Sequence, residues 1–336
     1  MKKQNTITRV LLLLLPLLSA LLTGCEREES VIYENPRLTF VGRYAGQGTY
    51  LKSFVTKIAN TDYSFVAAGN DGLQIFDVTD KSQPVPVVGY NITGYVEETY
   101  SCILGNVPYV FIAGNTGGIS VIDVSNINSA VLDTLLTLTG DNIKTVAADI
   151  SSKILFAGGT GKTVYLFDIS ALPSVTKISQ YQTFSNINRI AVKGSNAYVV
   201  QDQGIDIVSF SNPQSPERVS QGMSDHYAFD ISIDGNIAAI ANDNNGVLIL
   251  DISSPSSPVQ KSFLRTGGNA LTVANYGGIV YVGEGTGGVE AFSISNPSDP
   301  GFLADYKPNG SAVGITYYAG YVFVSDNSDY VILRYP

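Results

Sequence analysis

A short, mostly apolar phrase returns seven times between residue 73 and the C-terminus. The copies are LQIFDVTD (73–80), ISVIDVSN (119–126), VYLFDISA (164–171), IDIVSFSN (205–212), VLILDISS (247–254), VEAFSISN (289–296) and YVILRYP (330–336). Their anchor residues are Asp77, Asp123, Asp168, Ser209, Asp251, Ser293 and Arg334, separated by 46, 45, 41, 42, 42 and 41 positions. A period in the low forties is the length of one four-stranded blade of a β-propeller.

The content of each repeat fits such a blade. Within residues 228–266, AFDISIDG, NIAAIAND, VLILDIS and VQKSFLRT read as four strands separated by turn residues. The second and third of these are apolar on both alternating faces, so both faces must be covered. Neighbouring blades would supply that cover. The more polar fourth strand fits an outer edge, where charge and Pro discourage pairing with other molecules.

The two ends of the repeated region complement each other. The last copy stops at Pro336, after its third strand, whereas PRLTFVGRY (36–44) resembles the fourth strands PVPVVGY (84–90) and PVQKSF (258–263). A blade built from both termini would remove two open sheet edges. The sequence therefore predicts one all-β domain over 36–336, a closed seven-bladed β-propeller of four-stranded antiparallel blades. A ring of six or eight blades is the alternative.

The N-terminus has the features of an export signal. A basic segment, MKKQNTITR, precedes the apolar run VLLLLLPLLSALLTGC, which is typical of a secretory signal. Leu22-Thr23-Gly24-Cys25 resembles a bacterial lipobox, so we expect a signal peptide over 1–24, a lipid on Cys25 and a linker over 25–35. Several acyl chains would anchor the protein stably to a membrane. A plain signal peptide with a chance Cys is the alternative.

The segment that follows Cys25 bears on the side of the membrane. EREES resembles the acidic export signal that sends some Bacteroidetes lipoproteins to the outer face of the outer membrane. We therefore expect a lipid-anchored outer-membrane protein displayed at the cell surface, with a periplasm-facing location as the alternative.

Composition narrows the range of functions. The formal net charge is −9, and the first 24 residues contribute three positive charges, so the remainder is still more acidic. Such a chain repels nucleic acid. His226 is the single histidine, which excludes a His-rich metal site, and no cofactor or metal is expected. Cys102 lies in an apolar stretch and is interpreted as a buried free thiol.

The units GLQIFDVTDKSQPVPVVGY and GVLILDISSPSSPVQKSF resemble LVIVD repeats. The resemblance extends over residues 36–336 and departs from the family pattern at Ser209, Ser293 and Arg334, where the usual Asp is missing. It implies a β-propeller on the outside of bacterial and archaeal cells, with no settled activity and no catalytic motif.

Three recurring motifs have structural interpretations. GGTGKT (158–163) resembles a phosphate-binding loop, but Phe156 occupies the position of the first Gly and a strand follows instead of a helix, so a hairpin turn is expected. The Asp-, Asn- and Gly-rich turns fit hairpin geometry, with calcium binding as the alternative. The repeated Asp after each third strand is expected to accept backbone N–H bonds and fix a turn.

Candidate binding residues are polar or aromatic residues that do not repeat. Aligned on their turns, the first strands place Asp149, Arg189 and Asp230 at comparable depth in the channel, with His226 and Tyr227 just before Asp230. These residues could instead solvate the channel or pair with one another. The sequence favours a non-catalytic module that binds a protein or glycan. The alternatives are a hydrolase or lyase acting on polysaccharide at the channel mouth, and a structural subunit of an envelope complex.

Overall fold

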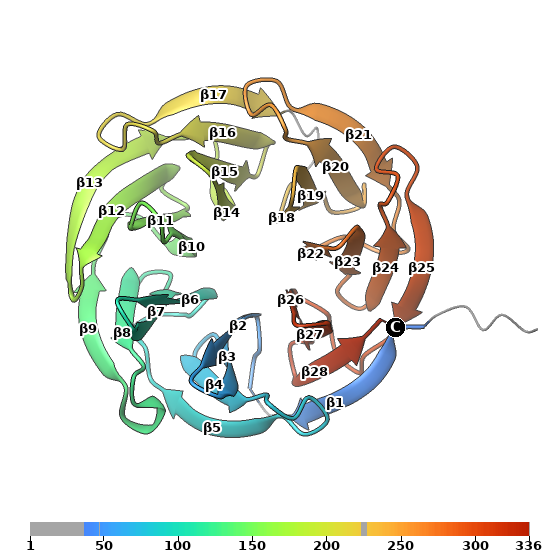
Figure 1. The fold of residues 1–336 in the computed structure, drawn as a ribbon, viewed down its shortest axis with the longest axis horizontal. Helices are drawn as coiled ribbons and strands as arrows, with labels where there is room; N and C mark the ends of the chain where they lie inside the picture. The colour runs from blue at the N-terminus through green and yellow to red at the C-terminus, as the bar shows by residue number, and fades with distance from the viewer. Residues whose placement is uncertain (1–36, 47, 223–226, 336) are drawn as a thin grey trace, which may run out of the picture. The chain divides into compact units, whose positions relative to one another are not determined.

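The computed structural model describes residues 37–335, apart from 47 and 223–226. Internal contacts divide the chain into Met1–Asn35 and Pro36–Pro336, and the described residues all belong to the second unit. They form seven four-stranded antiparallel sheets around a central axis (Figure 1). The predicted seven-bladed β-propeller is therefore confirmed.

Six blades are continuous in sequence. Blade 1 consists of β2 (Lys52–Ile58), β3 (Thr61–Ala67), β4 (Leu73–Asp77) and β5 (Val85–Tyr90), and blade 2 of β6 (Glu98–Leu104), β7 (Val107–Ala113), β8 (Ile119–Asp123) and β9 (Val131–Leu136). Blade 3 consists of β10 (Ile143–Asp149), β11 (Ile154–Gly159), β12 (Thr163–Ala171) and β13 (Ser174–Gln182), and blade 4 of β14 (Ile187–Lys193), β15 (Asn196–Gln201), β16 (Ile205–Ser209) and β17 (Glu217–Gly222). Blade 5 consists of β18 (Asp230–Asp234), β19 (Ile237–Ala241), β20 (Val247–Asp251) and β21 (Val259–Leu264), and blade 6 of β22 (Thr272–Tyr276), β23 (Ile279–Gly283), β24 (Val289–Ser293) and β25 (Gly301–Tyr306). A 3₁₀ turn, η1 (Ile127–Ser129), precedes β9.

Blade 7 combines the two ends of the described chain. Its strand order is β1 (Thr39–Ala45), β28 (Asp329–Arg334), β27 (Tyr321–Ser325) and β26 (Gly314–Tyr318). Thr39 lies opposite Arg334 and Ala45 opposite Asp329 in an antiparallel ladder. The N-terminal strand thus supplies the outer strand that the last repeat lacks, as the sequence predicts.

The hydrophobic core lies between blades. Phe65 and Ile75 of blade 1, for example, pack against Val110 and Ile122 of blade 2, all four side chains being buried. The same arrangement recurs around the ring, which explains why the second and third strands are apolar on both faces. Cys102 packs into the core between blades 2 and 3 as a free thiol, and burial raises its pKa to about 12.

The anchor residues after the third strands fix turns as expected. The Oδ1 atoms of Asp77, Asp123, Asp168 and Asp251 accept the backbone N–H two residues later at 2.7–3.0 Å. Ser209 and Ser293 accept the equivalent bond at 3.4 Å, which is longer and weaker. The GGTGKT segment spans the hairpin between β11 and β12, with a strand after it and Lys162 at φ 56°.

Candidate functional site

The first strand of every blade lines the channel (Figure 1), and each contributes one residue at the same level near its start. These seven residues, which we call the inner ring, are Lys52, Glu98, Thr145, Arg189, Asp230, Thr272 and Gly314. Their partners on the second strands are Ala67, Ala113, Gly158, Val200, Ala241, Gly283 and Ser325. A β-bulge precedes Thr145 and another precedes Arg189, so counting from the start of the strand does not find the level in blades 3 and 4.

Inner-ring side chains accept hydrogen bonds from backbone N–H groups at the open edge of the next blade. A first strand has a hydrogen-bonded neighbour on one side only, so its channel-facing N–H groups need other acceptors. Four inner-ring side chains each accept the N–H that follows the inner-ring residue of the next blade. The pairs are Val146 to Glu98 (3.4 Å), Ile190 to Thr145 (3.2 Å), Val273 to Asp230 (2.9 Å) and Ile315 to Thr272 (3.1 Å). Polar residues here therefore join blades.

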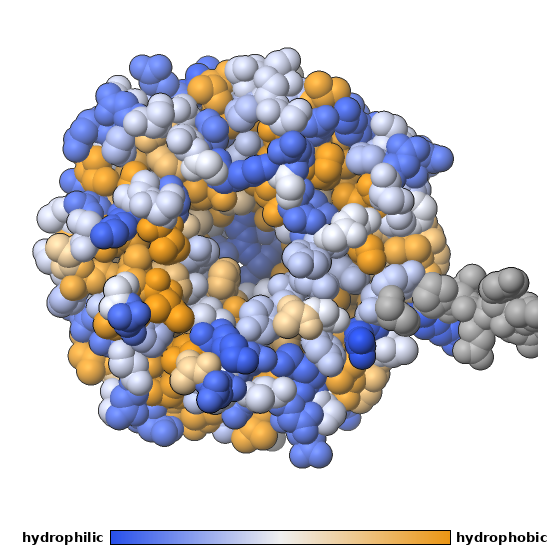
Figure 2. Space-filling view, in the orientation of Figure 1, coloured by the Kyte–Doolittle hydropathy of each residue, from blue (hydrophilic) through white to orange (hydrophobic). Residues whose placement is uncertain are grey.

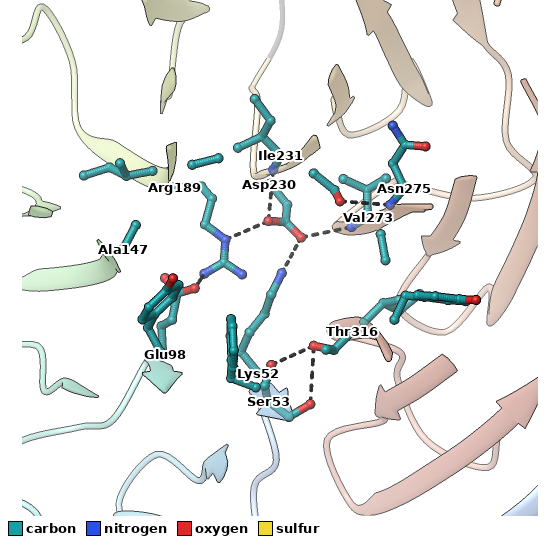
Figure 3. A pocket seen from close by; sticks show the side chains of 18 of the residues that line it. Lys52, Ser53, Glu98, Ala147, Arg189, Asp230, Ile231, Val273, Asn275 and Thr316 are labelled. Atoms are coloured by element: carbon teal, nitrogen blue, oxygen red, sulfur yellow. Dashed lines mark hydrogen bonds and ion pairs between the residues drawn. The ribbon is translucent and has the colours of Figure 1, made fainter. Parts of the chain in front are cut away.

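Four inner-ring residues form a charged network across the channel, which we call the quartet: Lys52, Glu98, Arg189 and Asp230 (Figure 3). The Arg189 Nε donates to Asp230 Oδ1 at 2.7 Å, and its Nη1 contacts Glu98. Lys52 reaches from blade 1 to Asp230 Oδ2 in blade 5, where Thr272 also donates at 2.7 Å. The quartet thus links blades 1, 2, 4 and 5 and carries two positive and two negative charges.

The electrostatics of the quartet follow from burial and mutual contact. Burial alone would raise the pKa of Asp230, but Lys52 and Arg189 hold it well below its usual value. Burial, together with Arg189, lowers the pKa of Lys52 to about 8 against the pull of Asp230. Burial raises the pKa of Glu98 despite Arg189. Asp230 is only 3% exposed, so its charge is stabilised by these partners and not by water.

A cavity of about 310 Å³ lies against the quartet inside the channel. Its wall is uneven. Aromatic side chains come from four successive blades: Tyr276 of blade 6, Tyr317 of blade 7, Phe54 of blade 1 and Tyr100 of blade 2. The other three contribute no aromatic side chain. Ala147, Ala191 and Ser232 stand there two positions after their inner-ring residues, as Phe54 and Tyr100 do, and Ile190, Val192 and Ile231 also line this side. Figure 2 shows a hollow at the centre of the ring with hydrophilic residues in its depth.

The aromatic side chains are ordered by stacking. The rings of Tyr276 and Tyr317 lie 4.3 Å apart at 18°, and Tyr317 stacks in turn on the buried Tyr281 at 5.9 Å. Phe54 and Tyr100 form a second, tilted pair at 4.7 Å. Tyr276 ends the stack and is 53% exposed. The aromatic wall is therefore held in place by the blades before any ligand arrives.

The candidate residues from the sequence divide into three groups. Arg189 and Asp230 are in direct contact within the quartet. The depth predicted for Asp149 is wrong: it lies at the far end of β10, opposite Ile154, where its Oδ1 accepts the Ser151 N–H at 3.0 Å and fixes the hairpin. Tyr227 is 58% exposed, stacks on Phe229 and does not line the cavity. His226 and Cys25 lie outside the described residues.

Sequence reasoning missed Lys52, Glu98 and the four aromatic residues. Lys52 and Glu98 each begin a first strand, so an alignment on strand starts would have revealed them. Phe54 and Tyr100 stand two positions after their inner-ring residues, Tyr276 four and Tyr317 three, so the aromatic residues follow no period. Their convergence is a property of the closed ring.

Comparison with known families agrees with this architecture. The profile of the LVIVD repeat matches residues 59–92, 103–134, 186–221, 225–266 and 267–307. These five matches cover more than half of the sequence, and the chain belongs to the LVIVD repeat family. No curated protein matches it. In the described part of the chain, no helix has the length and hydrophobicity needed to span a bilayer.

Proposed function

We propose that this protein is a non-catalytic binding module, tethered to a membrane by a lipid on Cys25, that takes its ligand into the channel cavity. The observation that carries the proposal is the uneven cavity wall. A repeat protein grows by copying one unit, and copies alone would give seven similar wall positions. Four aromatic residues on one side and none on the other make a shaped, largely preformed pocket, which is typical of ligand sites.

The contacts of Asp230 make it unsuited to act as a general base. Asp230 Oδ1 accepts from Arg189 and from the Ile231 N–H at 2.9 Å, while Oδ2 accepts from Lys52, Thr272 and the Val273 N–H. A general base needs a free lone pair within reach of a substrate proton and a pKa near the working pH. Asp230 has neither, since its oxygens are engaged and its pKa is depressed.

The anchor and the ligand would act together. A lipid on Cys25 followed by a linker would hold the propeller close to a membrane, and the expected surface display would expose the cavity to extracellular protein or glycan. The net negative charge of the protein disfavours nucleic acid as a partner.

Cavity binding is tested with a variant that fills the cavity. Full-length protein purified in detergent is screened by thermal shift against a library of metabolites, peptides and saccharides. Ala191→Trp places a large side chain among the cavity-lining residues and should abolish the shift, whereas Ala171→Trp, at the exposed end of β12, should not. If every hit shifts both variants equally, the cavity is not the binding site.

The anchor is tested by metabolic labelling with palmitate and by external protease. The parent chain should incorporate label and Cys25→Ser should not. Protection from protease until cell lysis would overturn surface display, and labelling of Cys25→Ser would overturn the lipid on Cys25.

A further inference from the structure

The cavity has a closed end. The quartet spans the channel from blade 1 to blade 5 and from blade 2 to blade 4, and Glu98, Arg189 and Asp230 are buried there. A ligand that enters past the aromatic wall therefore leaves by the same route. A volume of about 310 Å³ is near the lower end of the range of about 300–1,000 Å³ usual for small-molecule sites. The cavity fits a small molecule or the end of a chain, and not a polymer threaded through the ring.

The closed end offers hydrogen-bond donors. An ammonium group has three N–H donors and a guanidinium group five. Lys52 donates to Asp230 and Thr272, while Arg189 donates to Asp230 and Glu98. Donors thus remain on both cations, which line the cavity, whereas the oxygens of Asp230 are fully engaged. Because the two carboxylates balance the two cations, these donors suit neutral acceptor oxygens better than an anion.

The wall also carries hydroxyl groups. Ser232 accepts the Asn275 N–H at 2.9 Å, Thr316 donates to the Ser53 carbonyl at 2.6 Å, and both residues line the cavity. A hydroxyl group has one donor and two acceptor lone pairs. These bonds therefore leave hydrogen-bonding capacity on both residues for a ligand hydroxyl.

The aromatic wall offers a flat apolar surface beside these polar groups. Tyr317 covers one face of Tyr276, and no second ring or cation of the described residues stacks on Tyr276. A cationic ligand would also suit tyrosine rings, but the oxygens of Asp230 are already engaged by Arg189, Lys52 and Thr272, so Asp230 offers it no ion pair. The ligand must therefore combine a flat apolar face with hydroxyl groups that both donate and accept, and carry no net charge.

Sugars have this combination, because the C–H groups of a pyranose ring form a face and its hydroxyls point outward. We propose that the cavity binds the terminal residue of a neutral glycan, with the ring against Tyr276 and the hydroxyls toward Ser232, Thr316 and the quartet. This inference rests on the proposed binding function and names its ligand class.

The test uses full-length protein in detergent on a printed array of neutral and acidic oligosaccharides, followed by calorimetric titration of the strongest neutral saccharide. Tyr276→Ala should weaken binding at least tenfold, because it removes the stacking surface. Tyr276→Phe keeps the ring and should stay within threefold. Tyr227→Ala removes an exposed tyrosine away from the cavity and should change nothing. A cyclic form of the same oligosaccharide, which has no end, should not bind.

The outcomes separate the two proposals. Tenfold loss with Tyr276→Ala and retention with Tyr276→Phe, at unchanged melting temperature, supports a sugar site. Binding of acidic saccharides in preference to neutral ones, or equal binding by Tyr276→Ala, overturns the neutral-glycan assignment. If the library screen finds a non-saccharide ligand that Ala191→Trp abolishes, the binding module stands and the glycan assignment fails. If no ligand depends on the cavity, both fail.

Discussion

The quartet and the aromatic wall both lie on first strands and share two of them, β2 and β6, yet they differ in what their side chains touch. In the quartet, charged groups contact one another and the backbone of the next blade. In the wall, Tyr276 contacts one other ring and is otherwise exposed. The difference teaches that charge in a propeller channel is no sign of a site by itself. Groups that are fully engaged by the protein, such as the oxygens of Asp230, hold the ring together, and groups with an uncovered face or a remaining donor are available to a ligand.

The largest expected effect comes from the quartet. Asp230→Ala leaves Arg189 and Lys52 buried without their shared partner and frees the Val273 N–H. Removing one partner of a buried ion pair costs about 3–5 kcal/mol, so we predict a loss of that order in the free energy of unfolding, measured in urea. Ser232→Ala, on the same strand, loses only a bond to the Asn275 N–H and should cost about 1 kcal/mol. Equal losses of unfolding free energy in the two variants would show that Asp230 is no more important for stability than Ser232.

The second prediction concerns pH. The pKa of Asp230 is depressed in the folded state, so its stabilisation is complete above the unfolded value of about 3.9 and is lost as the pH falls toward the folded pKa. The difference in unfolding free energy between the parent and Asp230→Asn should therefore be constant from about pH 5 to 7 and shrink below about pH 4. A difference that grows in acid would show that Asp230 is not held as the anion.

The buried carboxyl group of Glu284 should change the unfolding free energy with pH in the opposite direction to Asp230. Burial and then Glu290 raise the pKa of Glu284 to about 8, and Glu290 itself accepts the Gly267 N–H at 3.1 Å. Folding is then favoured below the unfolded pKa of about 4.3 and loses that contribution as the pH rises through about 8. We predict that Glu284→Gln matches the parent near pH 4 and is more stable by about 1–3 kcal/mol at pH 9.

Glu290→Gln is the matched variant for this pair. It removes the side-chain charge beside Glu284 and should reduce the change of unfolding free energy with pH over the same range. If neither substitution alters the slope of unfolding free energy against pH between about 5 and 9, Glu290 does not raise the pKa of Glu284.

The smallest expected effect on stability comes from the aromatic wall. Tyr276→Ala removes one stacked pair of a half-exposed side chain and should cost about 0.5–1.5 kcal/mol, and Tyr276→Phe should be neutral within error. A cost comparable with that of Asp230→Ala, measured by the same urea titration, would show that the aromatic wall stabilises the fold as much as the quartet does.

The sequence predicted the fold well because the same pattern of strands and turns occurs seven times. Period, turn residues and two-sided apolar strands each point to blades, and the similarity of 36–44 to other fourth strands predicted closure. The site was predicted less well. Arg189 and Asp230 were found by their exceptional character, but Asp149 was misplaced because it belongs to the hairpin itself, where it pairs with Ile154, four positions after the inner-ring residue Thr145.

The sequence by itself determined the blade, its strand order and the complementary ends, since these follow from local periodicity and turn chemistry. Tertiary structure alone decided that Lys52, Glu98, Arg189 and Asp230 meet, although 178 positions separate Lys52 from Asp230. It also decided that four aromatic residues from blades 6, 7, 1 and 2 share one wall. Ring closure brings the first and last repeats together, and no local signal in the chain records which side chains then face each other across the axis.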